Sequence, residues 1–338
     1  MPSANKIHNL LKKVIFGDTL LPQEFTVPLI APQKEITVWL HGLGVPRDVT
    51  YCQSTVCSAP FIICIAFDTI QAPDKQNLER LSLKFCESDG HGQVLGEIGL
   101  RLTNRVSLSD LTLFFFEARS SANYCLSRIR LGSHYLLQAY TTKHQVNTSG
   151  MKMSFVERRA AMVSFIRPHP TSIVSVNDEV GGNIFIMNLM GDLGNNYFAF
   201  ALKSTRKPAH LVERTGRIAL SSVPFHEGKT AFQLAANHFK ESIEWDQLPF
   251  ATMRSRIFDI PVPDFALRVR EMKVELIHKI GSHTLFVARV VSNQTFSVGE
   301  ELHVVHGFYQ ARRLKESGAT LKASLAMDSL NKSGSRSV

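Results

Sequence analysis

The sequence has few cysteines and no long apolar run, and these absences exclude several classes of protein. Only five of the 338 residues are cysteine, and no two of them form a CxxC pair. An odd count without such a pair argues against a disulfide framework or a zinc site, so we expect no metal. Cys64 lies in an apolar run and is expected to be a small buried residue, with a redox role for Cys52 and Cys57 as the alternative.

The longest apolar run, from Ala59 to Phe67, has the length of a strand and is too short to span a bilayer. Residues 1–34 lack the charged region, apolar core and cleavage site of a signal peptide. These two absences predict a cytoplasmic protein that does not bind a membrane. The α/β-hydrolase class is also excluded. His41-Gly42-Leu43-Gly44 is similar to an oxyanion loop, but the chain contains no G-x-S-x-G nucleophile motif.

The chain is basic, with a net charge of +9 from 38 lysines and arginines against 29 acidic residues. The basic residues occur in short groups such as Arg254 and Arg256, or Arg312 and Arg313. A nucleic-acid-binding protein is expected to carry a dense basic stripe or a recognised motif, and neither is present. We therefore expect no nucleic acid partner. The charge is interpreted either as a solvated rim or as a field that attracts anionic small molecules.

A turn rich in hydroxyls and cations follows an apolar run in the middle of the chain. The run Tyr197–Leu202 predicts a strand that is buried on both faces. It ends in Lys203-Ser204-Thr205-Arg206-Lys207, after which Pro208 begins a helix that Gly216 ends. Hydroxyls and backbone N–H groups donate hydrogen bonds, the cations supply charge, and a helix N-terminus adds its dipole. The pattern suits a phosphate monoester, and the alternative is an ordinary solvated strand end.

Three further motifs accompany this turn in a fixed order. An entry strand begins at Arg167-Pro168-His169-Pro170, a hairpin over Val274–Val291 bends at Gly281-Ser282-His283-Thr284, and a closing strand covers His303–Tyr309. Together, over roughly residues 155–314, they resemble the flavin reductase-like family of FMN-binding split barrels. Two positions depart from that family's pattern: its usual acidic residue is Ser282 here, and its Pro-Pro or Asp-Pro step is Asn195-Asn196.

The resemblance implies a mainly β fold with a few helices, in which an FMN-binding split β-barrel forms the C-terminal half after a β-rich N-terminal domain. It implies an oxidoreductase that binds FMN, or FAD, and transfers hydride from NAD(P)H to the flavin. An oxygenase or another electron acceptor would be served. The implied contacts are Lys203, Ser204 and Thr205 with the phosphate, Asn188, Leu189 and Met190 along the isoalloxazine edge, Asn183 as a further cofactor contact, and His283 near the nicotinamide.

Hydride transfer depends on geometry, so no catalytic acid, base or nucleophile is expected in the chain. Two other functions stay open. One is a flavin-binding sensor or carrier without turnover, and the other is a protein-interaction module on the same fold.

The expected domains are a β-rich domain over 1–150, the barrel over 151–316 and a disordered tail over 317–338. Within the first domain, residues 1–34 are expected to form a helical entry and Tyr135–Tyr140 a strand. Within the second, Thr230–Trp245 carries apolar residues at helical spacing and predicts an amphipathic helix that closes one side of the barrel.

The two halves also contain two similar stretches, which suggest an internal repeat or a chance likeness. Ile65-Ala66-Phe67 and the strand to Cys86 match Phe200-Ala201-Leu202 and the strand to Ser221. In addition, Leu131-Gly132-Ser133-His134 matches Ile280-Gly281-Ser282-His283. The first half has Thr69-Ile70-Gln71 in place of the basic turn, so we expect one flavin site per chain. The family resemblance implies a homodimer, whereas a genuine repeat would let one chain supply both halves.

Overall fold

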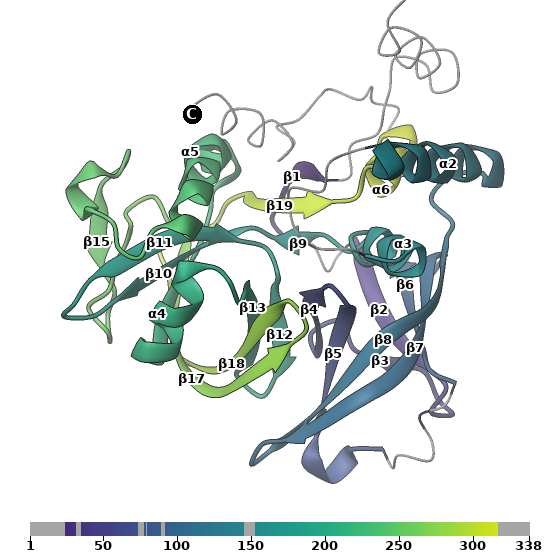
Figure 1. The fold of residues 1–338 in the computed structure, drawn as a ribbon, viewed down its shortest axis with the longest axis horizontal. Coiled ribbons are helices and arrows are strands. Elements are labelled where there is room, and N and C mark those ends of the chain that lie inside the picture. The colour runs from purple at the N-terminus through teal and green to yellow at the C-terminus, as the bar shows by residue number, and fades with distance from the viewer. Residues whose placement is uncertain are drawn as a thin grey trace, which may run out of the picture.

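Two seven-stranded antiparallel sheets, one in each half of the chain, form most of the protein (Figure 1). The computed structural model describes residues 24–31, 35–73, 78, 80–88, 92–144 and 153–316. The first sheet has the strand order β3-β2-β6-β7-β8-β5-β4. Its strands are β2 (Ile36–His41), β3 (Arg47–Asp48), β4 (Gln53–Ser58), β5 (Phe61–Asp68), β6 (Ser82–Glu87), β7 (Val94–Ser107) and β8 (Leu111–Asn123).

The second sheet has the order β11-β10-β14-β17-β18-β13-β12. Its strands are β10 (Ser172–Asn177), β11 (Gly182–Met187), β12 (Met190–Gly194), β13 (Tyr197–Lys203), β14 (Arg217–Ser222), β17 (Arg268–Ile280) and β18 (His283–Thr295). If the strands of each half are numbered from one to seven along the chain, both sheets have the order 2-1-5-6-7-4-3. The two halves therefore share one topology.

A small sheet bridges the two halves. Strand β19 (Glu301–Val305) pairs with β1 (Phe25–Leu29) on one side and with β9 (His169–Pro170) on the other. Three buried histidines belong to this bridging sheet or follow it directly: His169, His303 and His306. Burial lowers the pKa of His169 and His303 to about 4 and that of His306 to about 3. All three imidazoles are therefore neutral at neutral pH.

Two helices that follow residue 150 in the sequence complete the core of the first half. Helix α3 (Phe155–Ser164) contributes Val163 to that core, and α6 (Gly307–Glu316) contributes Phe308 and Tyr309. Helix α6 is also held by ion pairs, from Arg312 to Glu87 at 2.8 Å and from Arg313 to Glu35 at 2.7 Å. The first half thus depends on chain segments that follow the second-half sheet or precede it directly.

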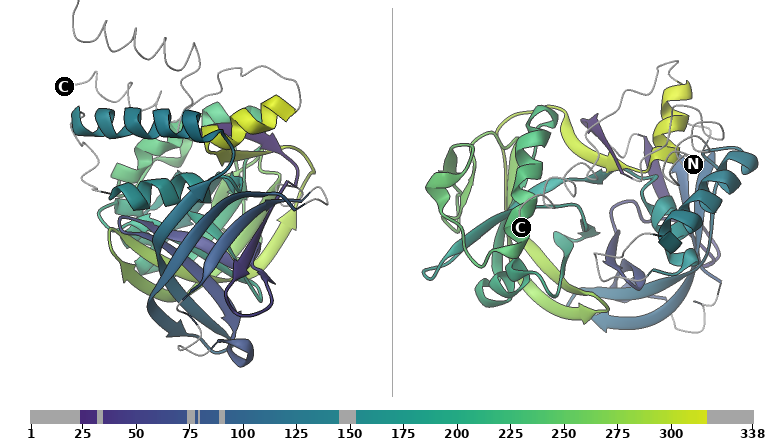
Figure 2. Two further views of the ribbon diagram at one scale, coloured as in Figure 1. Left: turned by 90° about the vertical axis from the view of Figure 1, so that its right-hand side faces the viewer. Right: turned by 45° about the horizontal axis from the view of Figure 1, so that its top comes forward.

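Helix α2 (Arg128–His144) lies beside α6 at one end of the first half (Figures 1 and 2). The His134 and Phe308 rings of these helices are 5.1 Å apart. The predicted strand over Tyr135–Tyr140 is wrong, because these residues lie in the middle of this helix. Apolar residues in a short run do not distinguish a strand from a helix face, and only the packing against α6 decides. Within the described residues, no helix is long and apolar enough to cross a bilayer.

In the second half, α4 (Lys207–Thr215) follows β13, and a broken helical segment lies along β11. This segment consists of α5 (Gly228–Gln233) and the 3-10 helix η5 (Leu234–Phe239). The single amphipathic helix predicted over Thr230–Trp245 is therefore wrong. The remaining short elements are η2 (Thr69–Gln71), η4 (Phe225–Glu227), η6 (Trp245–Gln247), β15 (Thr252–Arg254) and β16 (Pro261–Pro263).

The fold class predicted from the sequence is confirmed: the chain is mainly β, and a β-rich half precedes the barrel. The predicted strands around Tyr197–Leu202 and Arg217 are present, as is the helix that ends at Gly216, whose φ of 62° places it in the left-handed region. The helical entry over 1–34 is wrong where it is described, since Phe25–Leu29 is strand β1. The predicted tail over 317–338 and the boundary near residue 150 lie outside the described residues.

The closing strand is shorter than predicted from His303–Tyr309. Strand β19 ends at Val305, and Gly307 already begins α6. One of the two repeat matches is also wrong. Leu131–His134 lies in α2, whereas the turn that corresponds to Gly281 and Ser282 is the turn between β7 and β8. The other match is confirmed, because β5 and β13 occupy the same place in their sheets, as do β6 and β14.

Candidate functional site

The turn Lys203-Ser204-Thr205-Arg206 joins the end of β13 to the first residue of α4. Its position follows from the local sequence: the apolar strand ends at the first cation, and Pro208 occupies the first turn of the helix, where proline is favoured. Arg206 is the N-cap residue, and no side chain caps the helix there. The dipole of a helix favours an anion at such a place. Pro208 has no N–H, and the Ala209 N–H donates to the Arg206 carbonyl oxygen at 3.1 Å, so the side chains of the turn supply most of the donors.

The β17–β18 turn is hydrogen-bonded to the Lys203 turn. Lys203 lies opposite His283 in the pairing of β13 with β18. The Ser204 backbone N–H donates to the Ser282 carbonyl oxygen at 3.1 Å, and the Ser204 and Thr284 hydroxyls are 3.1 Å apart. Two turns that are about eighty residues apart in sequence are thus brought together, as the order of the sequence motifs predicted.

Two cations of the turn, Lys203 and Arg206, repel each other electrostatically. Partial burial lowers the pKa of Lys203, and the positive charge of Arg206 lowers it further. Burial also lowers the pKa of Arg206. An anion bound between the two groups would relieve both the desolvation and the repulsion. Lys207, by contrast, forms an exposed ion pair with Glu241.

Arg206 is held by an aromatic ring that sequence reasoning missed. Its guanidinium carbon lies 3.8 Å from the centroid of the Phe239 ring, at the end of η5. Such a stack fixes the direction of the guanidinium and still leaves its edge free to donate hydrogen bonds. Phe239 lies within the segment predicted to be an amphipathic helix, and it is 68% exposed.

The predicted isoalloxazine contacts lie beside the end of β13. The Ala201 N–H donates to the Leu189 carbonyl oxygen at 3.0 Å, so the segment from Asn188 to Met190 runs next to the strand that leads into the turn. Met190 is buried in the core of the second half and offers only its main chain. Asn188 and Leu189 are partly exposed.

Asn183 is not placed with this group. It is fully buried on β11, and its amide nitrogen donates to the carbonyl oxygens of Asn237 at 3.1 Å and Lys240 at 2.8 Å. Its amide oxygen is buried without a hydrogen-bond partner. The hydrogen bonds of this side chain fasten the η5 segment to the sheet.

His283 is buried and faces the first half of the chain. Its Nδ1 lies 2.9 Å from the Ser282 hydroxyl and 3.6 Å from Cys57 Sγ, and its Nε2 lies 3.4 Å from the Ser58 hydroxyl. Burial lowers the pKa of His283 to about 4, and the nearby charge of Lys203 adds to this effect. The imidazole is therefore neutral at neutral pH. Its surroundings are not those of a solvated turn residue.

Burial disfavours the thiolate form of two cysteines, Cys52 and Cys64. All five cysteines are free thiols, and burial raises the pKa of Cys64 far above its ordinary value. Burial also raises the pKa of Cys52. A thiol kept protonated in this way is a poor nucleophile and a poor metal ligand. The prediction that Cys64 is a small buried residue is confirmed.

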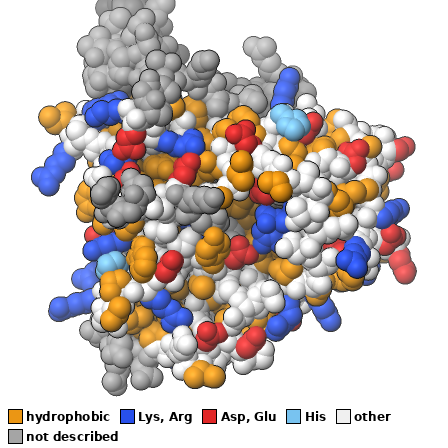
Figure 3. Space-filling view, turned by 180° about the vertical axis from the view of Figure 1, so that it is seen from behind, with side chains coloured by type: hydrophobic (Ala, Val, Ile, Leu, Met, Phe, Trp, Pro, Cys, Tyr) orange, Lys and Arg blue, Asp and Glu red, His pale blue; other side chains and the backbone are white. Residues whose placement is uncertain are grey.

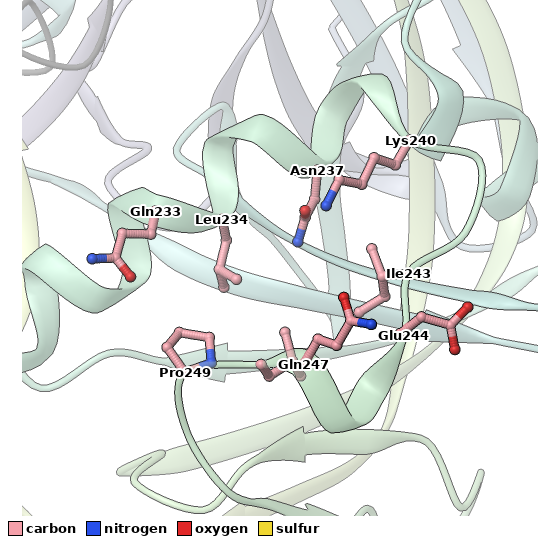
Figure 4. Close-up of a pocket in the computed structure, with 9 residues that line it drawn as sticks. Gln233, Leu234, Asn237, Lys240, Ile243, Glu244, Gln247 and Pro249 are labelled. Atoms are coloured by element: carbon pink, nitrogen blue, oxygen red, sulfur yellow. The ribbon is translucent and has the colours of Figure 1, made fainter. Parts of the chain in front are cut away.

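A separate cavity of about 300 Å³ lies between η5 and residues 243–249 (Figure 4). Its lining is mainly polar, and Asn237 points into it between Lys240 and Gln247. The carbonyl groups that Asn183 binds belong to two of these lining residues. The cavity is therefore next to the predicted contact Asn183, whereas the other predicted contacts gather around β13.

Basic side chains are dispersed in small groups over the face of the molecule seen from behind (Figure 3). This distribution agrees with the short basic groups in the sequence.

The donor set of the Lys203 turn fits a flavin phosphate. It offers two hydroxyls, two cations and an uncapped helix N-terminus, which are the groups that bind phosphate monoesters in proteins. The main chain from Asn188 to Met190 lies beside the end of β13, which is the strand that leads into this turn. The residues present are therefore compatible with an FMN molecule whose ring lies along this segment.

Residues 165–315 match the family model described as the flavin reductase like domain. This part of the chain is a flavin reductase like domain, as the resemblance in the sequence indicated. The match begins after α3 and ends within α6, so it contains the second sheet and the Lys203 turn. No protein with a curated description matches the chain.

Several solved structures are similar to a part of the chain. The styrene monooxygenase flavin reductase of Pseudomonas putida S12 is 21% identical, with 44% of this chain and 92% of that chain covered and a TM-score of 0.37. For the FMN-binding protein from Thermus thermophilus with bound p-hydroxybenzaldehyde the values are 21%, 40%, 81% and 0.37. For the NADH:FAD oxidoreductase SgcE6 of Streptomyces globisporus C-1027 they are 14%, 44%, 88% and 0.39. The assignment rests on the family match and not on these distant likenesses.

Proposed function

We propose that this protein binds FMN at the Lys203 turn and passes hydride from NADH or NADPH to the flavin. The observation that carries the proposal is the assembly of the turn itself. Lys203, Ser204 and Arg206 converge at an uncapped helix N-terminus, within the part of the chain that matches the flavin reductase like domain. FAD, which has the same isoalloxazine ring, is the second cofactor to test.

When bound, the flavin supplies the ring that accepts the hydride, and the chain supplies position and electrostatics. Lys203 and Arg206 neutralise the phosphate, while the Ser204 and Thr205 hydroxyls orient it. The main chain from Asn188 to Met190 lines the ring edge. The neutral His283 ring keeps the β17–β18 turn in place behind Ser204 and adds no positive charge there.

A flavin carrier or sensor without turnover is the second candidate, and the position of His283 favours it. The resemblance assigns that residue to the nicotinamide side, but its side chain is only 6% exposed and packs against Cys57 and Ser58. A contact with nicotinamide would require this packing to change. The burial of His283 is therefore compatible with flavin binding but does not support a contact with the hydride donor.

Two measurements test the proposal in sequence. The purified protein should show the visible absorption spectrum of a flavin, either as isolated or after addition of FMN. Rapid mixing with NADH or NADPH under anaerobic conditions should then bleach the long-wavelength flavin band. A protein that binds FMN but is bleached by neither donor is the carrier, and a protein that binds no flavin refutes both candidates. A cytoplasmic location remains a prediction from the sequence.

A further inference from the structure

We propose that the first half is a second copy of the split barrel that takes the place of a partner chain, so that one chain alone forms one phosphate site. The proposal rests on the proposed function only for the identity of the ligand. It chooses between the two assemblies that the sequence left open, a homodimer and a single chain that supplies both halves.

The first support is the equivalence of the two sheets. Both have the same strand order, and the long hairpins match closely, since β7 and β8 have 14 and 13 residues and β17 and β18 have 13 each. In each half the strand before the turn, β5 or β13, pairs with the second strand of this hairpin. Chance likeness of β-rich segments does not reproduce seven strands in one order.

The second support is the packing between the halves. One buried apolar cluster contains Cys57, Ile62 and Cys64 of the first half together with Tyr197 and Leu285 of the second. The corresponding edge strands β4 and β12 approach each other closely, because a Cβ added at Gly191 would lie 3.0 Å from the Gln53 carbonyl oxygen. Equivalent strands that meet each other are what a two-fold arrangement of two copies produces.

The third support is a pair of reciprocal contacts between equivalent turns. The β17–β18 turn packs on the β4–β5 turn, where the Ser282 N–H donates to the Ala59 carbonyl oxygen at 3.0 Å. The β7–β8 turn packs in the same way on the β12–β13 turn, where the Tyr197 hydroxyl donates to Asp110 Oδ1 at 2.7 Å. The first half therefore contributes Ala59, together with Ser58 beside His283, to the back of the phosphate site.

The two copies differ in charge at the turn itself. Asp68 lies opposite Leu111, the first residue of β8, and Lys203 lies opposite His283, the first residue of β18. Asp68 is thus the structural equivalent of Lys203, one position earlier than the sequence comparison of Thr69 with Lys203 suggested.

The first-half turn, Asp68-Thr69-Ile70-Gln71, contains a carboxylate and none of the cations of the Lys203 turn. The Arg47 guanidinium, which reaches this turn from β3, donates to the Gln71 side-chain oxygen at 3.3 Å. Asp68 instead accepts a hydrogen bond from the Asn195 amide, on the β12–β13 turn of the second half. The first-half position that is equivalent to Lys203 therefore forms a contact between the two halves and not an anion site.

The test uses the full chain, sedimentation equilibrium and titration with FMN followed by flavin fluorescence. The mass at micromolar concentration should be that of one chain, 37.8 kDa, with and without FMN. The titration should end at one equivalent per chain. Lys203→Glu should raise the Kd for FMN about tenfold or more. Asp68→Asn, at the equivalent position of the first half, should keep one equivalent and leave the Kd unchanged.

Three results would overturn the proposal: a mass of two chains, two equivalents of FMN per chain, or an undiminished affinity for FMN in Lys203→Glu. The mass does not depend on flavin. If the unmodified protein bound no FMN, the proposed function would fail, and sedimentation would still decide whether the first half replaces a partner chain.

Discussion

Replacing Lys203 by glutamine should weaken FMN much more than riboflavin, which is FMN without the phosphate. The variant keeps a polar side chain that is one atom shorter and removes its charge. A hydrogen bond to a charged group contributes roughly 1.5 to 3 kcal/mol. Because Lys203 is partly exposed, we reduce this to about 1 to 2 kcal/mol. Since 1.4 kcal/mol corresponds to a factor of ten, the Kd for FMN should rise about 5- to 30-fold.

The assay is a titration of both flavins against the unmodified protein and the variant, followed by quenching of flavin fluorescence. The ratio of the riboflavin Kd to the FMN Kd isolates the contribution of the phosphate, and this ratio should fall about 5- to 30-fold in the variant. Arg206 stays in place, so some preference for FMN should remain.

Lys273→Gln is the matched control, because it removes one positive charge at an exposed position on β17. An equal loss in this control would show that general charge, and not the turn, attracts the flavin. An unchanged ratio in Lys203→Gln would refute the assignment of the phosphate to this turn.

Three further predictions follow from the same contacts. Phe239→Leu should weaken FMN about 2- to 5-fold by releasing Arg206, as expected for an exposed cation–π pair, with riboflavin binding and thermal stability unchanged; equal loss of both flavins would contradict it. Gly281→Ala should lower the free energy of unfolding by about 2 to 5 kcal/mol, because the new Cβ would lie 2.7 Å from the Ala59 carbonyl oxygen at a φ of 52°. The control is Gly216→Ala, which has a φ of 62° and open space around it and should cost only about 1 kcal/mol. Urea unfolding measures both changes. The free energy of unfolding should be largest above pH 6.5 and fall as the pH drops toward 4, because the unfolded state takes up protons in this window and the folded state does not. Each buried histidine in or next to the bridging sheet should contribute on the order of 2 kcal/mol to this loss. A flat profile between pH 6.5 and 4 would refute the assignment of neutral imidazoles.

Local sequence was a good guide where a short-range rule decides the structure. The apolar run before Lys203 is a strand, Pro208 lies in the first turn of a helix, and Gly216 ends that helix in the left-handed region. These outcomes depend on side chains within a few positions of one another. The same local rules failed for Tyr135–Tyr140 and for Thr230–Trp245, where apolar residues fit more than one kind of element and tertiary packing decides.

The candidate site was predicted in part. The hydroxyls and cations of the turn, and the hairpin that faces it, were visible as motifs. The stack of Phe239 on Arg206 and the burial of His283 against Ser58 were not, because each joins residues from segments far apart in the chain. No local pattern in either segment indicates its partner.

The sequence by itself determined which strands and turns this protein can form, and it placed three cations and two hydroxyls at the start of one helix. Those features depend on backbone preferences and on the alternation of apolar and polar residues along a few positions. The tertiary structure decided that the two halves share one topology and pack on each other through equivalent turns. That result depends on contacts between residues more than a hundred positions apart, and only the folded chain brings Ser58 to His283 and Asp68 to Asn195.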